Sequence, residues 1–159
     1  MKLRIRPMRV KDKPAIMDIL CDTPEFKPSE IIVAEEVIDA YLTDSSESGY
    51  HIVVAVEGES LVGYFCYGPT PLTEGTWDFY WAAVDSLARG RGVGSALFRY
   101  GEEAIRQARG RLILIETSSK PEYAKTRRFH RKQGFKLAGR IADFYEPGDH
   151  KLVYSKRLR

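Results

Sequence analysis

The sequence is poor in cysteine, with only Cys21 and Cys66 among 159 residues. Both stand in apolar stretches, and they form neither a disulfide framework nor a zinc-ligand pattern. We therefore expect two buried free thiols and no metal site. Such thiols are typical of a reducing, cytoplasmic compartment and not of a disulfide-stabilised secreted protein.

Long apolar runs are missing as well. No stretch approaches the roughly 18 consecutive apolar residues of a membrane span, and the first residues alternate in polarity, unlike a signal peptide. The net charge is only +3, and the densest basic cluster, 125–132, carries no recognisable nucleic-acid-binding motif. We expect no membrane segment and no nucleic-acid partner, whereas a small anionic ligand fits the mild positive charge.

The remaining composition is that of one globular domain over residues 1–159, with 43% hydrophobic and 30% charged residues. Period-two and period-3.6 patterns alternate along the chain and predict seven strands and four helices. The predicted strands are 2–6, 51–56, 61–67, 77–84, 112–115, 135–144 and 151–156; the predicted helices are 13–21, 29–42, 93–108 and 120–133. Hairpins flank a single strand–helix–strand crossover, which predicts an α+β (mixed α/β) fold with helices on both faces of a mixed sheet.

Two local signals refine this picture. Gly101 lies inside a predicted helix, where glycine costs roughly 1 kcal/mol relative to alanine, so we expect close packing on the sheet there. Ser119, three residues before Glu122, has the spacing of a capping box and predicts the start of the last helix.

The stretch between the strand 77–84 and the helix 93–108 is rich in glycine. Gly90, Gly92 and Gly94 alternate there with Arg89, Arg91 and Val93. A strand, a glycine-rich turn and a helix N-terminus together form a recurrent phosphate-binding arrangement, because backbone N–H groups and the helix dipole both face the anion.

Two phosphate-binding motifs fit this loop poorly. The Walker A motif needs Gly-Lys followed by Ser or Thr, which occurs nowhere in the chain, so ATP or GTP hydrolysis is disfavoured. Gly92 and Gly94 match the dinucleotide-binding motif, and Glu116 is acidic at about the sequence distance that the motif expects. The motif needs Gly or Ala, however, at the position of Leu97. Because the match is partial, an NAD- or nucleotide-binding enzyme stays an alternative.

A third motif fits better. The segment from Arg89 to Gly94 reads Arg-x-x-Gly-x-Gly and resembles the acyl-CoA loop of the Gcn5-related N-acetyltransferases (GNAT). The segment Phe129–Phe135 resembles the family's late aromatic-Tyr-x-x-x-Gly-Phe stretch, and the order of elements matches over essentially the whole chain. The resemblance implies the GNAT-like fold, acetyl-CoA as co-substrate and acetyl transfer to a primary amine.

The resemblance also implies where acetyl-CoA would bind. Its pantetheine would pair with main-chain groups of Ala82, Ala83 and Val84, in a wedge between the strand 77–84 and the strand 111–117, and one N–H would polarise the thioester carbonyl. Its pyrophosphate would meet the loop amides and both arginines. The implied cofactor residues of this loop are Arg89, Gly90, Arg91, Gly92, Val93, Gly94 and Ser95.

In the family the amine attacks the thioester directly, and a tyrosine of the late segment protonates the leaving thiolate. This chain has His130 there, and a protonated imidazole could donate instead. Tyr123 and Tyr145 are substitute donors. If His130 only packs in the core, an acyl-CoA-binding regulatory module without catalysis becomes the alternative.

The base that deprotonates the amine would be Glu116 or Asp78, unless these carboxylates are merely salt-bridged or a water chain does the work. The acceptor would be a small molecule or a peptide, and it would approach over 24–31 and 146–150. The protein could also form a homodimer. Aromatic and acidic candidates for holding it are Phe26, Tyr41, Trp77, Tyr80, Trp81, Glu25, Asp143 and Asp149.

Overall fold

The computed structural model describes residues 2–158, which hold seven strands and five α-helices. The strands are β1 (Leu3–Pro7), β2 (His51–Glu57), β3 (Ser60–Pro69), β4 (Thr76–Val84), β5 (Leu112–Ser118), β6 (Lys136–Glu146) and β7 (Asp149–Arg157). The helices are α1 (Lys13–Cys21), α2 (Pro28–Thr43), α3 (Ser45–Ser48), α4 (Val93–Gln107) and α5 (Ala124–Lys132). All the predicted elements are present, and among the α-helices of residues 2–158 only the short α3 was not expected.

The strands follow the hydrogen-bonded order β1-β2-β3-β4-β5-β7-β6. β4 and β5 run parallel, from the pair Thr76–Leu112 to the pair Phe79–Ile115, with α4 as the crossover between them. The β1–β2, β2–β3, β5–β7 and β6–β7 pairs are antiparallel. The predicted mixed, mostly antiparallel sheet with one crossover is therefore confirmed.

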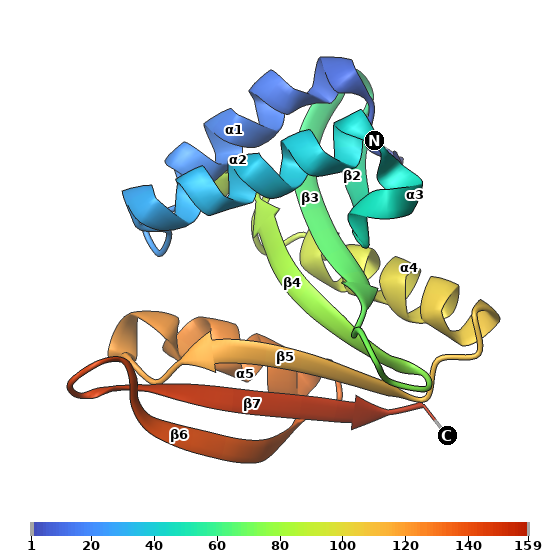
Figure 1. The fold of residues 1–159 in the computed structure, drawn as a ribbon. Coiled ribbons are helices and arrows are strands. Elements are labelled where there is room, and N and C mark those ends of the chain that lie inside the picture. Colours follow the sequence, from blue (N-terminus) through green and yellow to red (C-terminus); the bar gives the residue numbers. More distant parts are fainter. Residues whose placement is uncertain (1, 159) are drawn as a thin grey trace. The chain divides into compact units, whose positions relative to one another are not determined.

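The chain forms two compact units (Figure 1). The first holds the chain up to Gly68 together with Trp81–Ala104. The second holds Pro69–Tyr80 and the chain from Ile105 onward. β4 is shared, because Thr76–Tyr80 belongs to the second unit and its last four residues to the first.

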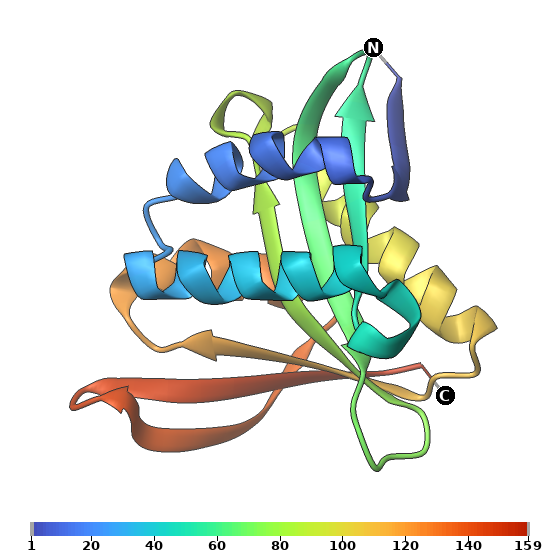
Figure 2. The ribbon, with the colours of Figure 1, turned by 45° about the horizontal axis from the view of Figure 1, so that its top comes forward.

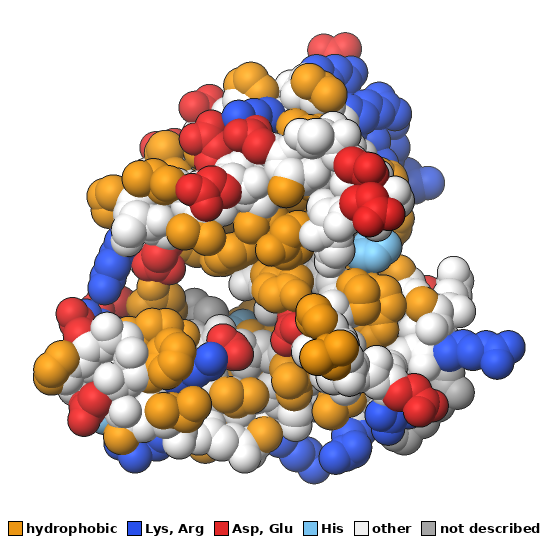
Figure 3. Space-filling model, in the orientation of Figure 1, with side chains coloured by type: hydrophobic (Ala, Val, Ile, Leu, Met, Phe, Trp, Pro, Cys, Tyr) orange, Lys and Arg blue, Asp and Glu red, His pale blue; other side chains and the backbone are white. Residues whose placement is uncertain are grey.

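The first unit is layered. α1 and α2 cross one face of β2 and β3, and α4 lies on the other face (Figure 2). β3 supplies both faces, since successive side chains of a strand point in opposite directions. Its centre, from Tyr64 to Cys66, is at most 1% exposed, as expected for a strand covered on both sides. Figure 3 shows acidic side chains gathered over α1 and α2, where Lys13 lies 2.7 Å from Asp39 and 3.0 Å from Glu35.

Two glycines allow α4 to approach β3 closely. A Cβ on Gly101 would lie 2.5 Å from Cε2 of Phe65, and a Cβ on Gly63 would lie 3.0 Å from Val93 Cγ1. At Gly101 the distance is too short for any carbon contact, so a Cβ there would force Phe65 to move, whereas at Gly63 the contact would be unusually tight. The expected packing role of Gly101 is confirmed.

The second unit packs α5 against its strands through aromatic rings. Phe79 of β4 and Phe135, just after α5, have ring centroids 5.8 Å apart. His130 of α5 meets Tyr154 of β7 edge-on at 5.9 Å. β6 pairs only with β7 in the strand order and is exposed along nearly its whole length.

Two sequence predictions are wrong. Ser119 does not cap a helix: its Oγ accepts a hydrogen bond from the His150 N–H at 2.9 Å, and α5 begins at Ala124 after a 3-10 turn. The Ser119 side chain binds the backbone of β7, which is distant in sequence. Both cysteines are free thiols, but Cys21 is exposed and only Cys66 is buried. Cys21 is the last residue of α1 and lies outside the stripe of Ile16, Ile19 and Leu20 that this helix buries.

Candidate functional site

The glycine-rich stretch forms a loop in the first unit between β4 and α4. After Val84 the chain makes a 3-10 turn at Ser86–Ala88, and α4 begins at Val93. Gly90 and Gly92 have φ values of 77° and 83°, in the left-handed region that favours glycine. A Cβ at either position would meet no heavy atom within 4 Å, so the backbone conformation and not crowding requires glycine here.

The loop leads into the N-terminus of a 15-residue helix. The first turn of a helix has N–H groups without intrahelical partners, and the helix dipole adds partial positive charge at that end. Val93 anchors this turn, since its side chain is 3% exposed, while the residues from Arg89 to Gly92 face solvent. The loop can therefore present several amides, and at least one guanidinium, to an anionic group.

The two arginines of the loop differ in their contacts. Nη2 of Arg91 lies 2.7 Å from Oε1 of Glu57, the last residue of β2. Nε of Arg89 donates a long hydrogen bond, 3.4 Å, to the carbonyl oxygen of Val84. Within residues 2–158, Arg89 forms no ion pair, so only Arg91 already has an anionic partner.

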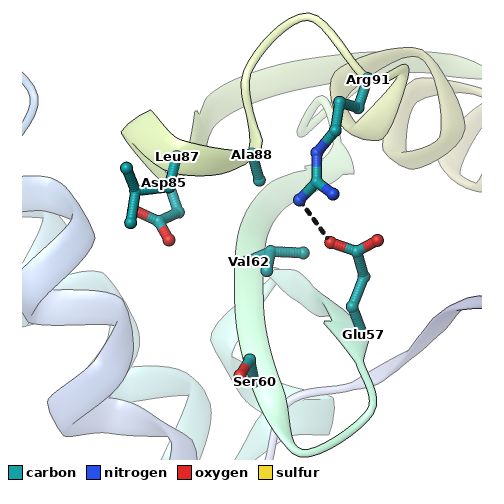
Figure 4. A pocket seen from close by; sticks show the side chains of 7 residues that line it. All are labelled: Glu57, Ser60, Val62, Asp85, Leu87, Ala88 and Arg91. Carbon is teal, nitrogen blue, oxygen red and sulfur yellow. Dashed lines mark hydrogen bonds and ion pairs between the residues drawn. The ribbon is translucent and has the colours of Figure 1, made fainter. Parts of the chain in front are cut away.

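A pocket of about 250 Å³ lies beside this loop. Its lining comes from the β2–β3 hairpin and from the segment after β4, and Figure 4 shows the Arg91–Glu57 pair joining the two. The lining residues are Glu57, Ser60, Val62, Asp85, Leu87, Ala88 and Arg91. Glu57 could not be recognised from the sequence, because its partner is 34 residues away.

The end of β4 that precedes the loop also belongs to the first unit. Ala83 is 5% exposed, and Ala82 and Val84 are half-buried. All ten residues that the sequence assigned to the cofactor therefore belong to this unit. The four catalytic candidates, Asp78, Glu116, Tyr123 and His130, all belong to the second unit.

Glu116 of β5 projects an accessible carboxylate. Its side chain is 51% exposed, and Oε2 lies 2.9 Å from Nζ of Lys151 on β7. Lys151 is better covered, at 15% exposure, and its ammonium lies 4.3 Å from the ring centroid of Phe144. Glu116 is thus salt-bridged, one of the two alternatives left open by the sequence, and it is also open to solvent.

Asp78 of β4 is held in hydrogen bonds. Its Oδ2 accepts one from Thr70 Oγ1 at 2.7 Å and a weaker one from the Tyr80 hydroxyl at 3.4 Å. The Thr70 N–H also donates to the carbonyl oxygen of Thr76 at 2.8 Å. Asp78 therefore ties the β3–β4 connection to β4, a structural task that the sequence did not reveal.

His130 lies in the core of the second unit. Its side chain is 6% exposed, and its ring neighbours are Phe129, Phe135 and Tyr154. Burial, aided by the nearby charge of Arg131, lowers the pKa of His130 to about 4. The imidazole is therefore neutral at pH 7, and the protonated form that the sequence interpretation needed is disfavoured.

The other acid and acceptor candidates fall into three groups. Tyr123, at the start of α5, is half-buried, whereas Tyr145 is 45% exposed. Asp149 is 3% exposed and accepts a hydrogen bond from the Ser118 hydroxyl, so this carboxylate is not available to hold an amine. The aromatic candidates and Glu25 are half-buried in their own units: Phe26, Tyr41 and Trp81 in the first, Trp77 and Tyr80 in the second.

Two further observations concern residues 2–158 only. No helix in this range is both long and apolar enough to cross a membrane. No group of three or more His, Cys, Asp or Glu side chains in the same range is arranged to hold a metal ion.

Comparisons with known proteins agree with the fold. The sequence model of the acetyltransferase (GNAT) family matches residues 13–135. A structure from Desulfovibrio desulfuricans, assigned to the GNAT family, is 37% identical over 99% of this chain and 100% of its own, with a TM-score of 0.96. No curated protein matches the chain.

Two more distant structures share the fold. An aminoglycoside 6'-N-acetyltransferase complexed with coenzyme A is 19% identical, with a TM-score of 0.75 over 98% of this chain and 97% of its own. The yncA protein of Salmonella typhimurium, solved with its cofactor acetyl-CoA, is 17% identical, with a TM-score of 0.78 over 99% of this chain and 94% of its own.

The fold, the family model and the 37% identical structure thus define an acyltransferase of the N-acetyltransferase class. The chain belongs to the acetyltransferase (GNAT) family, as the sequence resemblance indicated.

Proposed function

We propose that this protein transfers the acetyl group of acetyl-CoA directly to a primary amine of a small molecule or peptide, using residues 1–159 as one N-acetyltransferase domain. The observation that carries the proposal is the Arg89–Ser95 loop, with two left-handed glycines at the N-terminus of α4. The coenzyme A and acetyl-CoA complexes of two structural relatives support the choice of ligand.

The loop amides and Arg89 would hold the pyrophosphate of acetyl-CoA. Main-chain groups of Ala82, Ala83 and Val84 would pair with the pantetheine, and one of their N–H groups would stabilise the oxyanion that forms when the amine attacks. Apart from the Arg89 side chain, these assignments need only backbone groups of the first unit.

For the proton transfers we propose Glu116 as the base and Tyr123 as the acid. Glu116 is the more accessible of the two carboxylates, whereas Asp78 is engaged by Thr70. An ordinary phenol keeps its proton at pH 7, whereas the His130 imidazole is neutral in its aromatic surroundings. His130 then packs in the core and shapes the unit that carries both groups.

Binding and turnover test this function separately. Thermal unfolding is measured with acetyl-CoA, NAD and ATP, and acetyl-CoA alone is expected to raise the midpoint, since only a ligand that binds the folded state stabilises it. Stabilisation by NAD without stabilisation by acetyl-CoA would overturn the proposal. Release of free thiol from acetyl-CoA is then followed with a panel of amines, and amine-dependent release is expected with at least one class.

A further inference from the structure

The two loop arginines are candidates for the same pyrophosphate, yet their contacts differ. Arg91 reaches back to the β2–β3 hairpin and pairs with Glu57 at 2.7 Å. Arg89 lies on the other side of Gly90, and its side chain donates a hydrogen bond to the carbonyl oxygen of Val84 in its own segment. A guanidinium that is already paired must give up its carboxylate before it can pair with a phosphate.

Glu57 is well placed to keep that pair. Its side chain is 15% exposed, whereas the Arg91 side chain is 55% exposed. Partial burial weakens screening by solvent, and a carboxylate held there gains from an adjacent cation. In Figure 4 the two side chains point toward each other from the loop and from the end of β2.

Other contacts hold the two ends of the loop. At the start, the Asp85 N–H donates to the carbonyl oxygen of Val62 at 2.8 Å. At the end, Val93 packs against Gly63 of β3. Between them, a Cβ on Gly90 or Gly92 would have no heavy atom within 4 Å, so nothing crowds these two positions. The Gly92 carbonyl oxygen accepts a hydrogen bond from the Ala96 N–H at 3.0 Å.

We propose that Arg91 is a positioning residue. Glu57 holds Arg91, and the pair fixes the middle of the loop so that its N–H groups stay arranged for a pyrophosphate. Arg89 is then the arginine that contacts the phosphate charge. This inference rests on the proposed function, and it replaces the sequence expectation that both arginines contact the pyrophosphate.

The affinity for coenzyme A, measured by calorimetry, tests this in wild type, Glu57→Gln, Arg91→Met, the double variant and Arg89→Met. If the pair positions the loop, each single change weakens binding about fivefold, and the double variant binds no worse than either single one. In turnover assays the KM for acetyl-CoA rises with kcat unchanged. Arg89→Met weakens binding more than tenfold and lowers its dependence on salt.

If Arg91 contacts the phosphate directly, Glu57→Gln changes the affinity for coenzyme A in the opposite direction. Glu57→Gln would then free Arg91 and tighten binding, while Arg91→Met would weaken it, and this pair of results would overturn the inference. Exchanging the partners, Glu57→Arg with Arg91→Glu, should restore binding to within about twofold of wild type if the pair acts only by position.

Lys13→Met is a matched control, because it breaks an ion pair of the same length, to Asp39, in the same unit. It should leave the affinity for coenzyme A unchanged. Circular dichroism and the free energy of unfolding of each variant separate loss of folding from loss of binding. Failure of the wild-type protein to bind coenzyme A would overturn the proposed function itself. If the wild-type protein binds, and Glu57→Gln tightens binding while Arg91→Met weakens it, only the positioning role is overturned.

Discussion

Lys151 places its ammonium 2.9 Å from the carboxylate of Glu116, so the accessible carboxylate of β5 already has a cationic partner. The pair is unequal, because Lys151 is largely covered and Glu116 is half open to solvent. A substrate amine can therefore approach the Glu116 carboxylate without first displacing buried protein atoms.

Glu116→Gln is expected to lower kcat/KM about a hundredfold, because an amide cannot take the proton of the ammonium and a general base contributes on the order of 10²–10⁴ to the rate. Asp78→Asn should instead change the rate less than about threefold and cost about 1 kcal/mol of stability through its hydrogen bond to Thr70. Steady-state kinetics and urea unfolding check both variants. The reverse pattern would assign the base to Asp78.

Gly90 and Gly49 form a matched pair for testing the loop. Both have φ of +77°, and at both a Cβ would meet no heavy atom within 4 Å, but Gly49 follows the last residue of α3, away from the loop in sequence. Alanine at either position should cost a similar, small amount of stability, about 1 kcal/mol. Only Gly90→Ala should raise the KM for acetyl-CoA, by about tenfold. Equal kinetic effects of the two changes would remove the loop from the cofactor site.

The fold was largely predictable because its signals are local. The period-two strands, the amphipathic α4 and the left-handed glycines can all be recognised within a few neighbouring residues. The packing requirement at Gly101 could also be anticipated, since a glycine inside a helix needs a reason that propensity does not supply.

The partners of the charged and polar side chains were not predictable in this way. Glu57 with Arg91 and Lys151 with Glu116 join residues more than thirty positions apart, and only the folded chain brings them together. Ser119 shows the same limit, since its capping pattern is satisfied in sequence but its hydroxyl bonds to the backbone of β7.

His130 should make the protein sensitive to acid. Its pKa is lowered from 6.5 to about 4 by burial, so the unfolded chain binds a proton at this residue at a higher pH than the folded chain does. Stability from this residue is complete above pH 6.5 and is lost as the pH falls toward 4, by about 3 kcal/mol. His130→Phe should make the loss of unfolding free energy between pH 7 and pH 4.5 smaller by about 2 to 3 kcal/mol. An unchanged pH dependence in urea unfolding would show that His130 is not the titrating group.

The identity of the acid can be separated from core packing by removing single hydroxyl groups. Tyr123→Phe keeps the ring at the start of α5 and removes only the phenol proton, so kcat should fall about a hundredfold while the KM for acetyl-CoA stays within about twofold. Tyr145→Phe is the matched control at a more exposed tyrosine, and its kcat should stay near the wild-type value. A loss confined to Tyr145→Phe would move the acid to the end of β6. If kcat falls in neither variant, the thiolate takes its proton from solvent, since the neutral imidazole of His130 holds no extra proton at pH 7.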